Sequence, residues 1–308
     1  MGIKAFAPAS IGNIGVGFDI LGLALERPGD EVVARKSDTP GLRIAKITGH
    51  GGKLPYEPEK NTAGVAVQRF LEHIGEPDRG IELDIHKKMP LGSGLGSSAA
   101  SAVAAVLAVS ELLRTGLNKR DLLPFACQGE QLASGSFHAD NVAPSMLGGI
   151  ILIRDNATLD VHRLHVPRGL YVAVVYPQLE VLTKAARAIL KPEVPLAAYV
   201  RQSANVAGFI VGLFNGDIGL VGRSLRDDII EPQRAGLITG FYDVKEAALA
   251  EGALGSSISG AGPSVFALCA NSLVAENAGA AMQRAFARHG VESEVFLSAV
   301  NQEGAQIC

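Results

Sequence analysis

The segment PLGSGLGSSAAS, residues 90–101, is typical of a glycine-rich loop that runs into a helix. Before it, apolar and polar residues alternate over 81–86, which is the pattern of a half-buried strand. After it, residues 99–113 are apolar on nearly every side, so the sequence predicts a buried helix over 97–113. A strand, a glycine loop and a helix N-terminus together collect free backbone N–H groups and the positive end of a helix dipole. The segment therefore predicts an anion site.

The spacing of this loop differs from two familiar phosphate-binding motifs. The pattern GxxxxGK followed by serine or threonine occurs nowhere in the chain, and the loop has GxGxG where the dinucleotide motif has GxGxxG. A lone glycine loop most often is a tight turn that feeds a core helix. Ser97 and Ser98 favour a phosphate site, because their hydroxyls could cap the helix and face a metal–phosphate group. Since the loop lacks lysine, the helix dipole and Mg²⁺ would have to balance the phosphate charge, and an acid from elsewhere would have to bind the metal.

The composition excludes several function classes. The chain of 308 residues has 28 basic and 31 acidic side chains and no clustered basic face, which argues against nucleic-acid binding. The three cysteines and seven histidines show no metal-binding spacing. The longest apolar run, 99–109, is shorter than the roughly 20 residues that cross a bilayer, and MGIKAFAPAS lacks a signal-peptide core. We therefore expect a cytoplasmic protein without nucleic-acid or membrane partners.

Strand and helix patterns share the chain without alternating one for one, which favours an α+β fold over a doubly wound sheet. We expect strands over 31–34, 42–47, 81–86, 149–153, 171–176, 265–269 and 294–299. We expect helices over 62–74, 97–113, 119–133, 195–214, 240–250 and 274–289. The polar segment 155–167 predicts a boundary between domains 1–165 and 166–308. We also expect His162 and His165 to lie on opposite faces of one strand.

Two more small-residue loops accompany the first. PASIGNIGVGFDILG, residues 8–22, holds Asn13 and Asp19 among four glycines, and ISGAGPSVFAL, residues 258–268, is a glycine hinge before an apolar strand. Each alone predicts only a turn. Together they favour convergence on one ligand, because glycine allows close backbone approach. Asp19 suits a substrate amine or hydroxyl, and equally an Asx turn.

These motifs carry a resemblance. PLGSGLGSSAAS resembles the ATP-binding loop of the GHMP kinases (galacto-, homoserine, mevalonate and phosphomevalonate kinases). PASIGNIGVGFD resembles their first motif and SGAGPSVFAL their third, in the same order and at the usual distances. The segments GEQLASGSFHADNVAPSMLGG (129–149), LTKAARAIL (182–190) and DDIIEPQRAGLITGF (227–241) resemble the homoserine kinases in particular. The resemblance runs from residue 8 to residue 268.

The resemblance implies a fold and an activity. The fold would have an N-terminal ATP-binding domain like domain 2 of ribosomal protein S5, a ferredoxin-like C-terminal domain, and an active site in the cleft between them. The activity would be ATP- and Mg²⁺-dependent phosphorylation of the side-chain hydroxyl of L-homoserine to O-phospho-L-homoserine, in threonine biosynthesis. A homodimer is also implied.

The resemblance further implies site residues. The ATP loop would comprise Pro90, Leu91, Gly92, Ser93, Gly94, Leu95, Gly96, Ser97, Ser98, Ala99 and Ala100. Ser98 and Glu130 would hold Mg²⁺ and, with Asn141, form the catalytic set. The substrate would be surrounded by Asn13, Asp19, His138, Asp140, Asn141, Thr183, Arg187, Arg234 and Gly260. Two arginines suit a carboxylate, which a planar guanidinium binds bidentately, and Asp19 or Asp140 suits an α-ammonium group.

Asn141 separates the alternatives. Several relatives have an aspartate base near this position, whereas homoserine kinases share the asparagine, which implies positioning of the hydroxyl rather than base catalysis. A sugar or mevalonate-like alcohol is the alternative acceptor, and the residue and the two arginines disfavour it. A non-catalytic sensor is a third reading, which intact Ser98 and Glu130 disfavour. Lys87, just before the loop, is expected at the surface rather than at a phosphate.

Overall fold

The structure is a computed structural model that describes residues 2–49 and 51–308. Its first sheet has seven strands: β1 (Ile3–Gly12), β2 (Leu21–Lys36), β3 (Leu42–Thr48), β4 (Ile81–His86), β5 (Ile150–Asp155), β6 (Asp160–Leu164) and β11 (Gln306–Ile307). The order is β11-β1-β2-β4-β3, and β5 joins β2 to β6. β3 and β4 are parallel, and the other neighbours are antiparallel.

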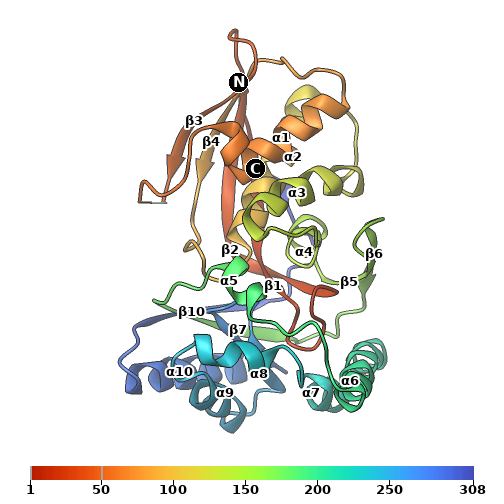
Figure 1. Cartoon of the computed structure of the whole chain (residues 1–308), viewed down its shortest axis with the longest axis vertical. Coiled ribbons are helices and arrows are strands. Elements are labelled where there is room, and N and C mark those ends of the chain that lie inside the picture. The colour runs from red at the N-terminus through yellow and green to blue at the C-terminus, as the bar shows by residue number, and fades with distance from the viewer. Residues whose placement is uncertain (1, 50) are drawn as a thin grey trace.

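The 16-residue strand β2 is the long element of this sheet. It pairs with β5 through residues 21–23 and with β4 through residues 31–36, while β1 runs beside it along most of its length. Strand β2 therefore runs from the end of the sheet that lies near the second domain to the outer end, where it pairs with β4 (Figure 1).

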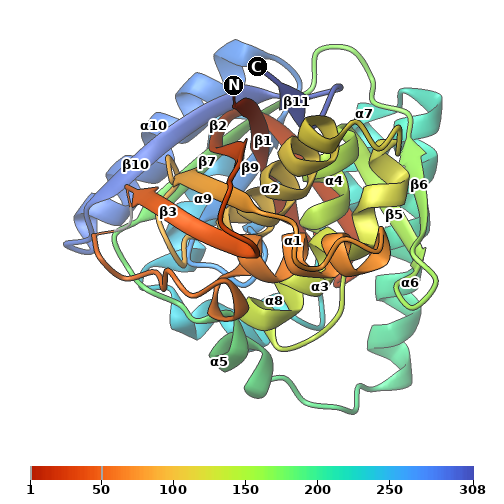
Figure 2. The same ribbon diagram turned by 90° about the horizontal axis from the view of Figure 1, so that it is seen from above.

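Helices cover one face of the first sheet. They are η1 (Pro58–Lys60), α1 (Thr62–His73), α2 (Ser97–Leu113), α3 (Lys119–Ser134) and α4 (Val142–Leu147). Helix α2 packs on β1 and β2, with α1 and α3 against its other sides (Figure 2). Its small side chains, mostly alanine, let these neighbours approach closely, and residues 99–106 are all buried. The predicted buried helix over 97–113 is confirmed.

The second sheet has four antiparallel strands in the order β10-β7-β9-β8. These are β7 (Tyr171–Pro177), β8 (Gly255–Ile258), β9 (Val265–Cys269) and β10 (Ser293–Ala299). The remaining helices are α5 (Thr183–Ala188), α6 (Leu196–Asn215), α7 (Ile218–Ser224), α8 (Glu231–Arg234), η2 (Ala235–Leu237), α9 (Phe241–Ala250) and α10 (Ser272–Arg288). Helices α9 and α10 cover the sheet on the side away from the first domain (Figure 1).

The strands and helices expected from local pattern are all present within a few residues, and the α+β fold class is confirmed. Local pattern did not predict β1, the first half of β2, β8, β11 or the one- or two-turn helices α4, α7 and α8. The polar segment expected as a boundary contains β6. Because β6 ends at Leu164, the expectation that His162 and His165 share a strand is wrong.

One apolar cluster joins the two domains, and a second lies between the second sheet and helices α9 and α10. Buried Phe209 and Leu213 of α6 belong to the same cluster as the buried residues of β1 and α2. Strand β11 follows the second sheet in the chain but pairs with β1 of the first sheet. The domain division at residue 165 stays a prediction. Among the described residues, no helix is long and apolar enough to cross a bilayer, and the expected cytoplasmic location stays a prediction.

Candidate active site

The three glycine loops meet at the N-terminus of α2. The backbone N–H of Ser10 donates to the carbonyl of Leu95 at 3.0 Å. This bond joins residues 8–22, here called the first loop, to residues 90–101, the phosphate loop, and residues 258–268 form the third loop. The N–H of Ser264 donates to the carbonyl of Ser93 at 3.1 Å, and the Ser259 hydroxyl donates to the carbonyl of Gly94 at 2.7 Å. Segments far apart in the chain thus fix one another, and the loops converge as their composition predicts.

Glycine is required at Gly94 for two reasons. Its φ of +78° lies in the left-handed region that side chains disfavour. A Cβ there would also lie 2.5 Å from the carbonyl oxygen of Ser259 and 2.8 Å from that of Gly262. The phosphate loop and the third loop therefore pack backbone against backbone.

A cavity of about 520 Å³ opens between the two domains at these loops. All the expected substrate residues line it, as do both expected metal ligands: Asn13, Asp19, Ser98, Glu130, His138, Asp140, Asn141, Thr183, Arg187, Arg234 and Gly260. The loop residues that line it are Leu91, Gly92, Ser93, Gly94, Gly96, Ser97 and Ser98. Leu95, Ala99 and Ala100 are buried in the core instead, and neither they nor Pro90 line the cavity.

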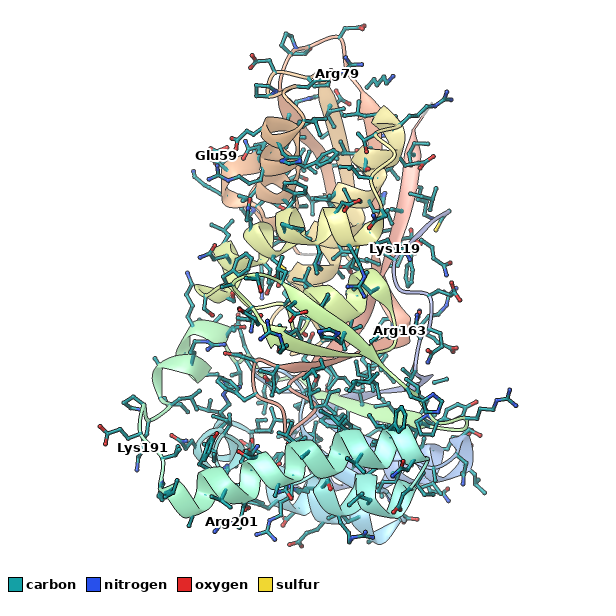
Figure 3. The ribbon with its side chains drawn as sticks, turned by 90° about the vertical axis from the view of Figure 1, so that its right-hand side faces the viewer. Glu59, Arg79, Lys119, Arg163, Lys191 and Arg201 are labelled. Atoms are coloured by element: carbon teal, nitrogen blue, oxygen red, sulfur yellow. The ribbon has the colours of Figure 1, made fainter. Side chains whose placement is uncertain are left out.

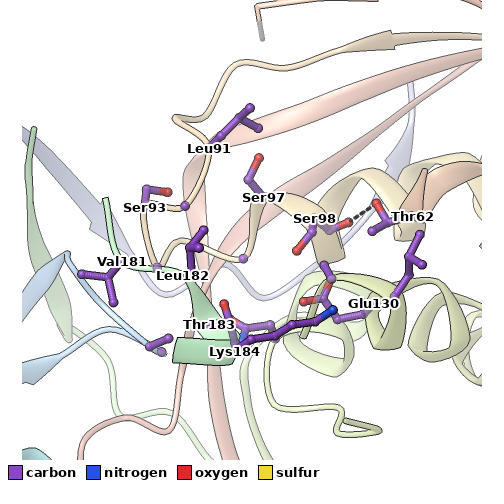
Figure 4. Close-up of a pocket in the computed structure, with 18 of the residues that line it drawn as sticks. Thr62, Leu91, Ser93, Ser97, Ser98, Glu130, Val181, Leu182, Thr183 and Lys184 are labelled. Atoms are coloured by element: carbon purple, nitrogen blue, oxygen red, sulfur yellow. Dashed lines mark hydrogen bonds between the residues drawn. The ribbon is translucent and has the colours of Figure 1, made fainter. Parts of the chain in front are cut away.

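Ser98 and Glu130 face each other across one end of the cavity (Figure 4). Glu130 comes from α3, and its side chain is buried against the first turn of α2. Burial raises the pKa of the Glu130 carboxyl to about 7, although a hydrogen bond from Ser98 opposes the rise. Its Oε2 atom has no hydrogen-bond partner among the described residues. A buried acceptor without a partner is costly and calls for a ligand.

Lys184 of α5 was not singled out from the sequence. Its side chain lines the cavity and extends toward Glu130 (Figure 4). It lies between Thr183 and Arg187 in the segment LTKAARAIL, whose resemblance to the homoserine kinases marks those two residues but not Lys184. Only the fold shows that this lysine reaches the cavity.

The start of α2 departs from expectation. The N-cap is Gly96, in the left-handed conformation and without a side-chain cap, so the expectation that Ser97 caps the helix is wrong. The Ser97 hydroxyl instead donates to Asp30 at 3.1 Å. Lys87 is not at the surface either, because it is buried in an ion pair with Asp30. This partner lies 57 residues earlier in the chain, which local pattern does not reveal.

At the other end of the cavity, the first loop is held by Asn13. The Asn13 amide donates to the carbonyl of Gly260 at 2.9 Å and accepts from the N–H of Asp19 at 2.9 Å. Both Asn13 and Asp19 have positive φ, of 67° and 61°. Asn13 therefore shapes the loop so that the Asp19 side chain projects into the cavity.

Two arginines from the second domain reach this loop. Arg187 of α5 donates bidentately to the Asp19 carboxylate at 2.9 and 2.7 Å, and this pairing raises the pKa of Arg187. Arg234 of α8 is buried and donates to the carbonyl oxygens of Ala186 and Gly260, both at 3.1 Å. Burial, reinforced by nearby Arg187, lowers the pKa of Arg234.

Phe18 is a site residue that sequence reasoning missed. The guanidinium carbons of Arg187 and Arg234 lie 5.1 and 5.2 Å from the centroid of its ring. Both contacts are within the range of cation–π interactions. A phenylalanine inside a loop motif looks like an ordinary core residue, and only the fold shows that it supports both arginines.

His138, Asp140 and Asn141 come from the turn that precedes α4. His138 Nδ1 is 2.5 Å from Asp140 Oδ1. Burial acts to lower the pKa of His138, but the Asp140 carboxylate outweighs it and the pKa is raised. Asn141 accepts a hydrogen bond from the Ser10 hydroxyl at 3.0 Å through its amide oxygen, so its NH₂ group is the part free to donate. Ligand atoms of Asp19, His138 and Asp140 lie within 4.8 Å of one another, close enough for one cation to contact all three.

Comparison with known proteins connects this geometry to a family. The model of the GHMP kinase N-terminal domain matches residues 61–149, and that of the GHMP kinase C-terminal domain matches residues 209–288. The chain is 46% identical to homoserine kinase of Chloroherpeton thalassium over 99% of both chains. It is 44% identical to homoserine kinase of Xanthomonas campestris pv. campestris over 99% of this chain and 93% of the relative.

Solved structures agree with these matches. The crystal structure of homoserine kinase from Cytophaga hutchinsonii superposes with a TM-score of 0.96 at 51% identity, over all of this chain and 97% of the other. L. major mevalonate kinase, solved with R-mevalonate, shares the fold at a TM-score of 0.74 and 19% identity, over 96% of each chain. The chain therefore belongs to the homoserine kinases of the GHMP kinase superfamily, a family of ATP-using phosphotransferases.

Proposed function

We propose that this protein transfers the γ-phosphoryl group of ATP to the side-chain hydroxyl of L-homoserine, which gives O-phospho-L-homoserine and ADP for threonine biosynthesis. The observation that carries the proposal is the pairing of two chemistries in one cavity. A glycine loop with Ser98 and Glu130 lies at one end, and a cluster of acids and arginines lies at the other. The first suits a nucleotide phosphate and the second suits an amino acid.

The phosphate end depends on backbone groups. The glycine loop and the first turn of α2 offer unpaired N–H groups and the positive end of the dipole of a 17-residue helix. Residues 92, 94 and 96 are glycines with positive φ, so the loop exposes backbone rather than side chains. The loop residues can thus bind and orient the phosphates without a lysine.

The donor set at Ser98 and Glu130 fits Mg²⁺. Magnesium prefers hard oxygen ligands and usually takes only one or two carboxylates from a protein. The unpartnered Oε2 of Glu130 and the nearby Ser98 hydroxyl supply such ligands. When bound there, Mg²⁺ would neutralise phosphate charge and favour a loosely bonded transferring phosphoryl group.

The acceptor end matches a zwitterion. Asp19 is paired with Arg187 across the two domains, and buried Arg234 lies beside them over the same Phe18 ring. An α-ammonium group can bind Asp19 or Asp140, while an α-carboxylate can bind the two arginines. Galactose carries neither charge and mevalonate only the negative one, so either would leave part of this set without a counter-charge.

Asn141 positions the acceptor and cannot take its proton. The amide NH₂ can donate to the hydroxyl oxygen, because the amide oxygen already accepts from Ser10. Phosphoryl transfer through a loose transition state gains more from positioning and charge stabilisation than from a strong base. The presence of both Ser98 and Glu130 disfavours a sensor that binds these ligands without transfer.

We also infer a homodimer that forms through α6. This helix lies along the outside of the molecule (Figure 3), and Arg201 is its one charged residue. Its exposed apolar stripe includes Val200 (57% exposed) and Phe214 (78% exposed). Two copies packed antiparallel, with Ala204 of one copy against Ala207 of the other, would place Val200 against Val211 of the other copy. Small residues at the crossing allow close approach, and an uncharged stripe suits a surface like itself.

The first prediction concerns the substrate. Purified protein with Mg-ATP should release ADP rapidly with L-homoserine and far more slowly with L-threonine or L-serine. Those two amino acids carry the hydroxyl on the β-carbon, one atom closer to the α-carbon than in homoserine. Mevalonate and galactose should give no release above background. Activity on one of these two alcohols would keep the phosphate site and reject the acceptor site. No release with any compound would reject the function.

The second prediction concerns Glu130. Because the folded pKa of about 7 exceeds the unfolded value of 4.5, the folded state holds the proton more tightly, and wild-type stability should fall as pH rises from 4.5 to 7. In urea titrations without Mg²⁺, the free energy of unfolding of Glu130→Gln should decline less over this pH range than that of wild type, by up to roughly 3 kcal/mol. The variant should also lose turnover by about 100-fold or more. Unchanged turnover would remove Glu130 from the metal site.

The third prediction concerns Arg234. Arg234→Lys should raise the KM for homoserine about ten-fold or more, because a point charge loses the planar donors that bind a carboxylate. The KM for ATP should stay near wild type, since Arg234 lies at the acceptor end. Arg226→Lys, on an exposed arginine of the same domain, is the matched control and should change neither constant. An unchanged homoserine KM in Arg234→Lys would exclude a carboxylate contact.

The fourth prediction concerns the dimer. Light scattering should give a mass of two chains for wild type and one chain for Val200→Glu, because the substitution puts a charge in an apolar contact. Leu273→Glu changes an equally exposed residue (64%) on α10 and should leave the mass unchanged. A wild-type monomer, or a dimer that survives Val200→Glu, would rule out this interface.

A further inference from the structure

A buried ion pair lies behind the phosphate loop and takes no part in the chemistry described above. Lys87 Nζ is paired with the Asp30 carboxylate, and their side chains are 2% and 0% exposed. Lys87 follows β4 directly and borders the cavity, so a direct contact with phosphate has to be considered first. All three N–H bonds of the lysine, however, already donate to protein acceptors. Its three donors go to Asp30, to the carbonyl of Ser97 at 2.7 Å and to the hydroxyl of Ser101 at 2.7 Å.

The Asp30 carboxylate contacts both ends of the phosphate loop. Its Oδ1 accepts from the backbone N–H groups of Lys88 at 2.8 Å and Met89 at 3.3 Å, where the chain leaves β4. Its Oδ2 accepts from the hydroxyls of Ser97 and Ser101, both at 3.1 Å, where the chain enters α2. One side chain from β2 thus fixes where the loop begins and where it ends.

The pair also sets the rotation of the first turn of α2. Successive residues of a helix point about 100° apart around its axis. Because Ser97 is turned toward Asp30, the next side chain, Ser98, is turned away from the pair and toward Glu130 (Figure 4). A rotation of this turn would separate Ser98 from Glu130, and a displacement of about 1 Å at a reacting group can reduce a rate about 100-fold.

We propose that Lys87 and Asp30 are positioning residues that hold both ends of the phosphate loop and orient Ser98 for the nucleotide. The proposal rests on the proposed function, since it assigns the loop to ATP. The three positive-φ glycines make the loop intrinsically mobile, so its geometry has to be imposed from its ends. The pair acts at the nucleotide end and leaves the homoserine end unchanged.

The double variant Lys87→Met/Asp30→Asn separates positioning from stability. Removing one member of a buried pair leaves an unpaired charge, whereas removing both is often neutral for stability. The amide introduced by Asp30→Asn would also keep an oxygen for the two loop N–H groups. We expect a urea midpoint near wild type, a loss of about ten-fold or more in kcat/KM for ATP, and a homoserine KM within about two-fold of wild type.

The neighbouring exposed pair is the matched control. Lys88 and Glu31 directly follow Lys87 and Asp30 in the chain, and their side chains lie 2.8 Å apart, with Lys88 half exposed. Lys88→Met/Glu31→Gln should leave the urea midpoint and all kinetic constants near wild type. If the double variant at Lys87 and Asp30 keeps wild-type kcat/KM for ATP, the pair is structural only and the proposal fails. If the homoserine KM of this double variant rises by as large a factor as its kcat/KM for ATP falls, the proposal is overturned as well.

Ser101→Ala provides a test that does not depend on the folding of the double variant. It removes one hydrogen bond from each member of the pair and leaves no charge unpaired. We expect a loss of a few-fold in kcat/KM for ATP alone, and no loss would contradict the proposal. Absence of turnover in wild type would reject the proposed function instead, so the two failures are distinguishable.

Discussion

A phosphate loop without lysine must hold its anion with backbone N–H groups, and backbone groups bind only where the fold places them. The packing of three glycine loops against one another meets this constraint. The carbonyls of Ser93, Gly94 and Leu95 all accept hydrogen bonds from the first or third loop, so the phosphate loop has contacts with both sheets. The apolar cluster that spans both domains also limits their relative movement, which keeps these loops in register.

The elements that local pattern determines were predictable from the sequence. The buried helix α2 and the strands β4 and β9 were expected within their observed limits, since each has a clear period or a continuous apolar run. Strand β1 was missed because IKAFAPASIG has few β-branched residues and contains a proline, so pairing with β2 and β11 determines it rather than propensity. The short helices α4 and α8 have no periodicity to detect and are set by the loops around them.

Some residues of the candidate site were likewise predictable from the sequence, and others were not. The glycine loop and its serines could be found from composition and spacing alone. Glu130 and Arg187 were identified only through resemblance to a family, because an acid or arginine on an amphipathic helix looks like a solvated charge. The contacts of Asp30 and of Phe18 could not be predicted at all, since their partners lie far away in the chain. Such partnerships depend on strand register and domain packing, which a single sequence does not reveal.

The acceptor end gains its selectivity from charge balance. Two acids, Asp19 and Asp140, and two arginines, Arg187 and Arg234, share a small, largely buried volume in which an unmatched charge is expensive. When a zwitterion is inserted between Asp19 and Arg187, its α-ammonium group pairs with Asp19 and its α-carboxylate pairs with Arg187. No charge then loses its partner. An alcohol with only a carboxylate would separate the same pair and leave an acid without a counter-charge. The proposed preference for an amino acid would therefore follow from the ion pair itself, and Asn141 would then only have to orient the hydroxyl.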